Sequence, residues 1–342
     1  MAPLRVAIIG CGLIGARRAK EVQQHLGTQL SVVADVHAER RKQLAAQYGC
    51  SAVEHWQAAI DDRAVDVVVI ATPNGYTAEI GIAALSAGKH VLVEKPPGRN
   101  LVEAGQLADA SRKAGRVLKV GFNHRYHPAI TKAHRLLNDG MIGELITIRA
   151  RYGHGGRPGY EKEWRGNPAI AGGGELTDQG VHIADLVHWF AGLPTEVFAM
   201  LQTSVWPIHP LEDNAFGLLR FASGAVATVH TSWTQWKNLF SFEIFGQCGS
   251  LTVEGLGGSY GAERLVTAIR NAEGGAPTMA EERFDGPDLS WEAEWAEFVH
   301  AVVDGASYWG RPEEGVAAMI LLDALYRSAR RGSVVRLSEV RQ

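Results

Sequence analysis

The chain has few cysteines, little net charge and no long apolar run. Its three cysteines, Cys11, Cys50 and Cys248, form no CxxC pair, which argues against a disulfide framework or a thiolate metal site and fits a reducing compartment. A formal net charge of −3 gives no electrostatic footprint for nucleic acid or anionic lipid. No segment approaches the roughly 18 consecutive apolar residues of a membrane helix, and the apolar start of the chain leads into a glycine turn instead of a signal-cleavage site. We therefore expect a cytoplasmic protein that binds neither nucleic acid nor membrane.

The 342 residues exceed a usual single core, so the length predicts two domains. The first third alternates short β-branched apolar runs with alanine- and leucine-rich amphipathic segments, a pattern typical of buried parallel strands with crossover helices. The predicted strands cover 4–10, 29–35, 65–72, 89–95 and 116–121, and the predicted helices cover 13–25, 37–48, 76–87 and 100–114. Residues 1–122 therefore predict a doubly wound α/β domain of the Rossmann type.

The alternation of short apolar runs with helical segments ends after Gly121, and residues 123–342 predict a second, α+β domain. A helix over 128–138, a strand over 143–152 and a Gly/Pro-rich loop over 153–174 lead into a further helix. Short strand-like runs with intervening turns fill 195–270 and predict an antiparallel sheet. Two amphipathic helices over 291–304 and 313–331 either cover that sheet or pack back on the first domain.

A glycine motif stands where a dinucleotide-binding domain needs it. The run Gly10-Cys11-Gly12-Leu13-Ile14-Gly15 follows a predicted strand and opens a predicted helix, whose N-terminus would stabilise a pyrophosphate. Asp35 ends the second strand, 20 residues after Gly15, where a carboxylate binds ribose hydroxyls and repels a 2′-phosphate. These residues predict NAD as cofactor, while Arg40 and Arg41 keep NADP as the lesser alternative. A glycine-rich turn without a ligand is the structural alternative.

Four further segments resemble one family. They are ATPN at 71–74, AGKHVLVEKP at 87–96, GFNHRYHP at 121–128 and EWRGNPAIAGGGELTDQGVHIADLVHWFAG at 163–192. Together they resemble the glucose–fructose oxidoreductase, inositol dehydrogenase and MocA (Gfo/Idh/MocA) family, from the first strand to about residue 255.

The resemblance implies a Rossmann domain followed by a large, mainly antiparallel sheet whose open face makes a homodimer or homotetramer contact. It also implies roles for particular residues: Thr72, Pro73, Asn74 and Glu94 at the cofactor, Lys95 at the reaction centre, and Asp178 with His182 completing the site. The chain departs from the family pattern at Thr77, where histidine is common, and at Pro97, where leucine or methionine is common.

Oxidation of an alcohol by a nicotinamide needs a base for the hydroxyl proton. Asp178 and His182 are four residues apart in a predicted helix, so they share a face, and the aspartate could fix the imidazole tautomer. His182 is one candidate base, and Lys95, at the carboxyl end of a predicted parallel strand, is the other. A metal at Asp178 and His182 would need a third ligand, and His188 faces elsewhere on a helix, so no metal is expected.

Polar and aromatic residues of the second domain are candidates for binding a polyol, because aromatic faces pack on sugar rings while polar groups take the hydroxyls. Besides Lys95 and His182, the candidates are Asn123, Arg125, Tyr126, Tyr152, His154, Trp164, Gln179 and Trp236. The alternatives are core or interface residues for the tryptophans, and an ion-pair member or a cofactor contact for Arg125. Four loop cations, Arg151, Arg157, Lys162 and Arg165, leave a nucleotide-linked sugar open as substrate.

The sequence therefore predicts an NAD-dependent dehydrogenase that acts on a secondary hydroxyl or ketone carbon of a sugar, glycoside or cyclitol. A nucleotide-sugar dehydrogenase and a non-catalytic NAD-binding regulator on the same fold are the alternatives. Two others, an NAD-using glycosidase and an enzyme whose retained cofactor cycles between two sugars, have no dedicated signal.

Overall fold

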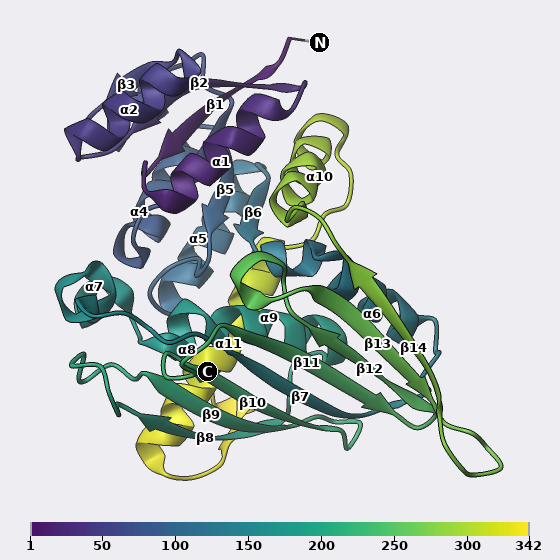
Figure 1. Ribbon diagram of the computed structural model, residues 1–342. Helices are drawn as coiled ribbons and strands as arrows, with labels where there is room; N and C mark the ends of the chain where they lie inside the picture. Colours follow the sequence, from purple (N-terminus) through teal and green to yellow (C-terminus); the bar gives the residue numbers. More distant parts are fainter. Residues whose placement is uncertain (1, 341–342) are drawn as a thin grey trace. The chain divides into compact units, whose positions relative to one another are not determined.

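The computed structural model describes residues 2–340 and divides into two compact units, whose elements are drawn in Figure 1. The first unit contains the residues up to Phe122 together with Trp291–Val316. The second contains Asn123–Ser290 and the residues from Ala317 onward. Residues 291–316, part of the 123–342 segment, thus belong to the first unit, which is one of the two places that the sequence left open for the C-terminal helices.

The first unit is built on a six-stranded parallel sheet in the order β3-β2-β1-β4-β5-β6. This is the strand order of dinucleotide-binding domains, and it reverses between β1 and β4, where ligands of such sheets bind beyond the carboxyl ends of the strands. The strands are β1 (Leu4–Ile9), β2 (Thr28–Ala34), β3 (Ser51–Val53), β4 (Val67–Ile70), β5 (His90–Glu94) and β6 (Leu118–Gly121). The helices between them are α1 (Leu13–Gln24), α2 (Ala38–Tyr48), α3 (Trp56–Asp61), α4 (Asn74–Ser86) and α5 (Leu101–Ala114).

Helix α10 (Ser290–Asp304) joins the first unit because its apolar face enters that unit's core. Trp295, Phe298 and Val299 pack in one buried cluster with residues of β1 and α1 such as Val6 and Val22. The Trp295 indole also donates to the hydroxyl of Thr28 on β2 at 3.3 Å. A segment from the last sixth of the sequence therefore completes the hydrophobic core of the dinucleotide-binding unit.

The second unit is built on a nine-stranded, mainly antiparallel sheet in the order β14-β13-β12-β11-β7-β10-β9-β8-β15. Within this sheet the β7–β10 pair is parallel, and the other described pairings are antiparallel. Side chains alternate along β7: Ile148, Ala150 and Tyr152 are buried, while Arg149 and Arg151 are exposed. The strands are β7 (Leu145–Gly153), β8 (Glu196–Gln202), β9 (Asn214–Arg220), β10 (Val226–Ser232), β11 (Leu239–Gly246), β12 (Gly249–Glu254), β13 (Glu263–Ile269), β14 (Thr278–Phe284) and β15 (Val335–Arg336).

Helices cover one face of this sheet. Helix α9 packs on β7 and β10, and α6 packs on β12 and β13. The helices and helical turns of the unit are η1 (Asn123–Tyr126), α6 (Pro128–Asn138), η2 (Tyr160–Lys162), η3 (Trp164–Gly166), α7 (Pro168–Ala171), α8 (Glu175–Asp178), α9 (Gly180–Ala191), η4 (Gly258–Tyr260), η5 (Leu337–Glu339) and most of α11 (Pro312–Arg331). The other face keeps exposed apolar side chains, including Met200, Phe216 and Leu218.

Most predicted elements are present, and the differences have local causes. Strand β3 and helix α3 are only three and six residues long, too short to show a period. Strand β14 was not predicted because all its residues except Phe284 are exposed, so neither face is marked by apolar residues. The 153–174 loop contains the turns η2 and η3 and the four-residue helix α7.

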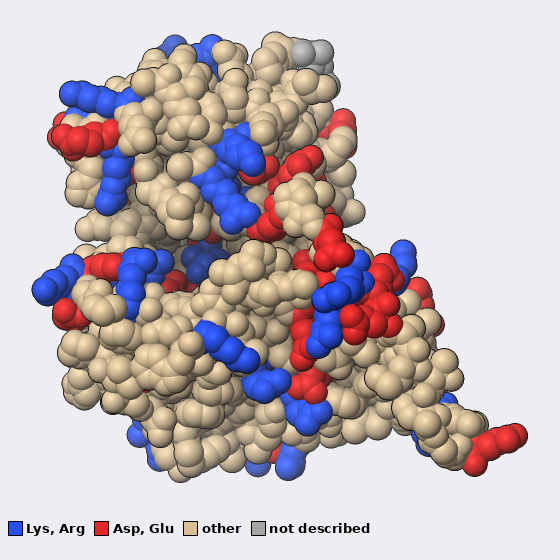
Figure 2. Space-filling view, in the orientation of Figure 1, with Lys and Arg blue, Asp and Glu red and all other residues tan. Residues whose placement is uncertain are grey.

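Charges of both signs are interspersed on the face drawn in Figure 2, including over β13 and β14, where Arg264 bridges Glu254 and Glu281 and Lys132 pairs with Glu282. Within residues 2–340, no helix combines the length and the apolar character that a membrane span requires.

Candidate active site

The turn between β1 and α1 has a backbone that requires glycine. Gly10 has φ +95°, and a Cβ on it would lie 2.5 Å from the Ala71 carbonyl oxygen, while a Cβ on Gly15 would lie 1.8 Å from the Gly10 carbonyl oxygen. A Cβ on Gly12 would meet nothing within 4 Å, and no side chain caps the helix that begins at Leu13. The turn is therefore tightly packed at Gly10 and Gly15 but leaves open space beside Gly12, where the N–H groups of the first turn of α1 face outward. This open cradle fits a pyrophosphate group.

Asp35, which follows β2, is fixed beside the glycine turn. Its Oδ2 accepts the Cys11 N–H at 2.7 Å and its Oδ1 accepts the His37 N–H at 2.8 Å. Arg41, one of the two arginines that kept NADP open, donates to the Asp35 carbonyl oxygen at 3.1 Å and to the Glu54 carboxylate at 3.0 Å. The local charge of Arg41 is therefore compensated, while the Asp35 carboxylate stands at the position that binds a ribose in such sheets.

Thr72 and Pro73 lead from β4 into α4, which begins at Asn74. The Thr72 hydroxyl oxygen is buried and finds no hydrogen-bond partner among residues 2–340, which a ligand beside the turn would supply. Thr77 is buried and donates its hydroxyl to the Asn74 carbonyl oxygen at 2.9 Å. The residue that departs from the family pattern is thus bonded within its own helix.

Lys95 follows β5 in a turn that buried charges hold in place. The Glu94 carboxylate accepts from Arg18 Nε at 2.7 Å, and Arg18 Nη2 lies 2.7 Å from Glu294 Oε2. Burial raises the pKa of Glu294, whereas the two carboxylates raise the pKa of Arg18 against the effect of burial. A Cβ on Gly121, opposite Glu94 on β6, would lie 2.9 Å from the Arg18 guanidinium. The side chain of Glu94, expected at the cofactor, is instead committed to Arg18 and anchors the half-buried Lys95.

Asp178 and His182 lie on two successive helices, so the single helix expected from the sequence was wrong. Helix α8 ends at Asp178, α9 begins at Gly180, and Gln179 lies between them. The Asp178 carboxylate accepts from Arg165 Nε at 2.8 Å. Burial works against the charge of Arg165, but Asp178 outweighs it, so the pKa of Arg165 is raised. A loop cation that the sequence offered to a phosphate therefore compensates the aspartate.

His182 belongs to a cluster that we call the imidazole–tyrosine wall: His124, Tyr152, Gln179, His182 and Tyr260. The rings of His124 and His182 are stacked, with centroids 3.7 Å apart and planes 20° apart. The Tyr152 ring meets His124 edge-on at 5.2 Å, and Gln179 donates to the Tyr260 hydroxyl at 2.9 Å. Burial raises the pKa of both tyrosines, so both keep their hydroxyl protons.

Two substrate candidates bond inside the unit. Arg125 is fully buried, with Nε 2.8 Å and Nη2 2.5 Å from the two carboxylate oxygens of Asp185. Asn123 is 5% exposed and donates to the Ser290 hydroxyl at 3.0 Å. Arg125 is therefore the ion-pair member that the sequence allowed as an alternative, and a substrate contact of either side chain stays a prediction.

The remaining candidates reach the surface. Trp236 is 68% exposed and is the one non-glycine residue with positive φ, 56°, among residues 2–340. Trp164 is half-buried under the guanidinium carbon of Arg165, 4.4 Å from the ring centroid. His154 accepts the Gly156 N–H at 2.9 Å, and burial lowers its pKa, while Tyr126 is half-buried. These side chains stay candidates for substrate contact.

Comparisons with known proteins agree with this geometry. The model of an oxidoreductase family with an NAD-binding Rossmann fold matches residues 4–122, and the model of the GFO/IDH/MocA C-terminal domain matches residues 130–252. The 1,5-anhydro-D-fructose reductase of Ensifer adhaerens is 31% identical over 337 residues, which cover 95% of this chain and 94% of that protein. The chain belongs to the Gfo/Idh/MocA oxidoreductase family.

Other family members extend the comparison. The levoglucosan dehydrogenase of Pseudarthrobacter phenanthrenivorans (strain DSM 18606 / JCM 16027 / LMG 23796 / Sphe3) is 32% identical over 248 residues, and the alignment spans 64% of this chain and 63% of that protein, less than two thirds of its length. A solved levoglucosan dehydrogenase in complex with NADH and levoglucosan is 26% identical, with a TM-score of 0.88 over 98% of this chain and 99% of that one. As a Gfo/Idh/MocA member, the chain is an NAD(P)-dependent oxidoreductase that acts on CH–OH groups.

Several residues around the family motifs were not singled out by the sequence. His124 lies inside the quoted GFNHRYHP segment, but nothing in a linear motif shows that its ring stacks on His182. Tyr260 has no local signal, because its partner Gln179 is 81 residues away. Glu212, whose pKa burial raises, accepts the Gly174 and Leu176 N–H groups at 3.1 and 3.0 Å and so holds the start of α8.

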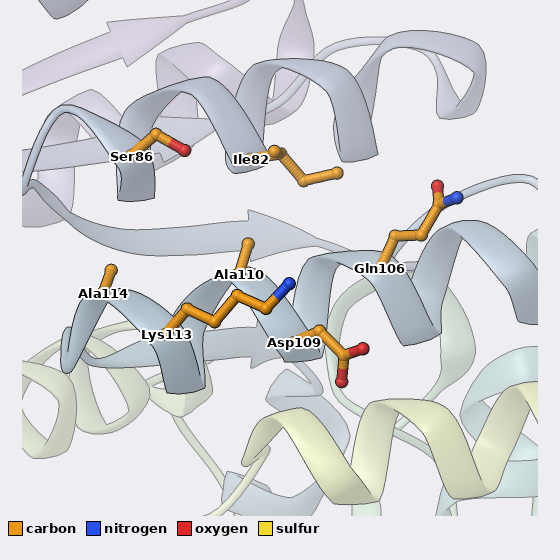
Figure 3. A pocket seen from close by; sticks show the side chains of 7 residues that line it. All are labelled: Ile82, Ser86, Gln106, Asp109, Ala110, Lys113 and Ala114. Atoms are coloured by element: carbon orange, nitrogen blue, oxygen red, sulfur yellow. The ribbon is translucent and has the colours of Figure 1, made fainter.

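A surface groove lies between α4 and α5 (Figure 3). It is lined by Ile82, Ser86, Gln106, Asp109, Ala110, Lys113 and Ala114. Ile82 stands eight residues after Asn74, about 12 Å along the helix, so the groove does not adjoin the start of α4. Over the described range 2–340, no group of three or more His, Cys, Asp and Glu residues could hold a metal ion.

Proposed function

We propose that the chain is an NAD-dependent dehydrogenase that transfers hydride between the nicotinamide and a secondary hydroxyl or ketone carbon of a phosphate-free sugar, glycoside or cyclitol, amino-sugar glycosides included. The imidazole–tyrosine wall carries this proposal. It combines aromatic faces, which pack on a sugar ring, with imidazole, amide and phenol groups, which bind hydroxyls. The relatives named above support a sugar substrate, since they are named for levoglucosan and 1,5-anhydro-D-fructose.

The charges around Asp35 support NAD over NADP. The Asp35 carboxylate would repel a 2′-phosphate, and the guanidinium of Arg41 is occupied by the Asp35 carbonyl oxygen and Glu54. Exposed Arg40 remains the cation that an NADP-binding alternative would use.

The loop cations argue against a nucleotide-sugar substrate. Arg157 forms two hydrogen bonds of 2.9 Å with the Glu163 carboxylate, and Arg165 bonds to Asp178. Arg151 projects from the exposed face of β7 toward Ser241 of the neighbouring strand β11. Because three of the four cations have such partners, a diphosphate would have to displace existing contacts to bind them.

A bound nicotinamide would supply the hydride chemistry of the proposed reaction, and this chain's residues would hold the substrate and move its proton. His182 is the proposed base, since its imidazole lies in the wall and imidazole is the side chain that most often serves as a general base. Lys95 is proposed to polarise the substrate oxygen or to share the base role. Asp178 would orient the polar groups around the substrate and is itself held by its ion pair with Arg165.

A spectrophotometric panel tests the proposal. Purified protein is mixed with NAD or NADP and with free sugars, anhydrosugars, glycosides, inositols or nucleotide sugars, and reduced nicotinamide is followed by absorbance. Lys95→Ala and His182→Ala are expected to lose turnover while still binding NAD. Lys113→Ala and His300→Ala, both exposed positions, are the matched controls and should retain it.

The outcomes separate the alternatives. NADH formation with one phosphate-free class supports the proposal, and preference for a nucleotide sugar replaces that substrate class. No reduction of either cofactor, although NAD binds, would favour the closed-cycle or regulator alternatives. Release of a smaller sugar without net NADH would indicate a glycosidase.

We also propose that the open face of the nine-stranded sheet joins copies of this chain into a homodimer or homotetramer. Exposed Phe216 and Leu218 on β9 and Met200 on β8 form an apolar patch on that face. Light scattering should show an oligomer that Leu218→Asp disrupts, and a monomeric native chain would refute this. The cytoplasmic location stays a prediction from the sequence.

A further inference from the structure

A chain of hydrogen bonds fixes the proton position of one imidazole in the wall. Ser290 Oγ lies 2.6 Å from Asp288 Oδ1 and donates to it, because an ionised carboxylate only accepts. Ser290 Oγ therefore accepts from Asn123 Nδ2 at 3.0 Å, which turns Asn123 Oδ1 toward His124 Nδ1 at 3.2 Å. Since an amide oxygen only accepts, neutral His124 carries its proton on Nδ1.

The His124 ring, whose proton position is fixed in this way, stacks on one face of the His182 ring. His124 and His182 are 6% and 5% exposed, and their rings are nearly parallel at a centroid distance of 3.7 Å. If both rings were protonated, two positive charges would lie at van der Waals distance from each other, in a place shielded from bulk water. Such a pair takes up its protons in two separated steps.

The groups facing the pair are two tyrosines, a paired imidazole, an apolar ring and two carboxyls. Tyr152 of β7 and Tyr260 of η4 stay neutral because burial raises their pKa. The ring of His127 lies 5.7 Å from that of His124, but its Nδ1 pairs with Glu263 of β13 at 2.9 Å. The other neighbours are Phe240 of β11, which does not titrate, and the α8 carboxyls Glu175 and Asp178, which act electrostatically on Tyr152.

We propose that His124 is a positioning residue for His182: the Asp288–Ser290–Asn123 chain locks its tautomer, and its stacked ring fixes the plane of His182 and limits the pair to one proton. This deepens the proposed function, because it rests on His182 as the base of that reaction. A base must be neutral before turnover, and repulsion across the stack disfavours a proton on His182 whenever His124 carries one.

The test follows the ring signals of both histidines by NMR in the full-length protein, with no substrate. His124→Phe and His182→Phe each keep a flat ring and remove one titrating group. We expect the histidine left in each variant to titrate in one step. In the native protein the second proton should be taken up at least about one pH unit below the lower of those two steps, or not before unfolding. Independent titration of both rings at the single-variant values would overturn the proposal.

A second measurement needs no folded variant of the pair. The ring nitrogen shifts of native neutral His124 should show the Nδ1–H form. Ser290→Ala, which leaves both rings in place, should allow the Nε2–H form to appear. A native His124 in the Nε2–H form would contradict the hydrogen-bond chain.

A kinetic arm separates this inference from the proposed function. The low-pH limb of kcat/KM in His124→Phe should follow the His182 titration seen by NMR, whereas His300→Phe should leave both unchanged. If NMR shows the coupling but the limb does not follow, the stacking proposal is supported and His182 is removed from the base role.

Discussion

Replacing Arg18 by methionine is expected to destabilise the first unit by about 3–5 kcal/mol, the cost of leaving buried charge without its partner. Arg18 stands between Glu94 and Glu294, and the three side chains are 0%, 10% and 0% exposed. Methionine has a similar length and keeps contact with Trp291, whose ring centroid lies 4.4 Å from the guanidinium carbon. The variant therefore removes the charge with little change in volume and leaves two carboxylates facing each other.

The loss should depend on pH in a definite direction. Burial already raises the pKa of Glu294, and removing Arg18 would raise it further. An acid whose folded-state pKa exceeds its unfolded value stabilises the fold at low pH and loses this contribution as pH rises through the folded value. The cost of Arg18→Met should thus be largest above neutral pH and should shrink toward about pH 5.

Urea unfolding followed by tryptophan fluorescence at two pH values measures this effect. Arg17→Met is the matched control, since its half-buried guanidinium stacks on the same Trp291 ring at 4.6 Å and its loss should cost about 1 kcal/mol or less. Adding Glu94→Gln and Glu294→Gln to Arg18→Met should recover most of the stability at pH 7. A loss below about 1 kcal/mol, or a larger one that does not change with pH, would refute the reasoning.

Three further predictions concern other sites. Burial lowers the pKa of His134 from 6.5 to about 4, so neutral His134 contributes fully to the free energy of unfolding above pH 6.5 and loses this contribution as pH falls toward 4. Over that window, urea unfolding should show native protein losing about 3 kcal/mol more stability than His134→Phe. Equal losses in the two proteins would contradict this. Asp35→Ala should raise the kcat/KM ratio of NADP to NAD by about tenfold or more, and an unchanged ratio in steady-state assays would remove Asp35 from cofactor selection. Gly174→Ala puts a Cβ 2.1 Å from the Glu212 carbonyl oxygen and should cost at least about 2 kcal/mol by denaturant titration, whereas Gly105→Ala in α5, where a Cβ meets nothing within 4 Å, should cost none.

The sequence shows an element where its burial follows a simple period. Strands β4 and β5 are buried along almost their whole length, so they stand out as continuous apolar runs. Helix α10 has an equally clear apolar face, but periodicity shows only that a face is buried and not which surface buries it. Trp295 and Phe298 join the first unit's core through contacts with strands more than 250 residues earlier, and no local pattern encodes that.

The residues of the candidate site also divide into those with a local sequence signal and those without one. The glycine turn and Asp35 were predictable because their geometry depends on short spacings within one strand–helix–strand unit. The motif residues Asn123 and Arg125 were not assignable, since a polar side chain in a motif can face a ligand or an internal partner, and here Ser290 and Asp185 are the partners. Only the folded chain shows which of these two roles a polar residue of a motif has.

The two segments that contain candidate catalytic residues, one around Lys95 and one around Asp178, are each held by side chains that lie outside the family motifs. In the first unit, Glu294 of α10 holds Arg18, which holds the Glu94 carboxylate next to Lys95. In the second unit, Tyr326 of α11 plays the corresponding part.

The Tyr326 hydroxyl donates to Glu212 Oε1 at 2.7 Å, and that oxygen also accepts the N–H groups of Gly174 and Leu176 at the start of α8. A Cβ on Gly173 would lie 2.1 Å from Thr177 Oγ1 and 2.2 Å from the Tyr326 hydroxyl oxygen, so Gly173 leaves the space that these two side chains occupy. The two C-terminal helices contain none of the candidate site residues. Yet they supply the side chains that hold Lys95 and Asp178, so a chain ending before α10 would keep every motif and lose both supports.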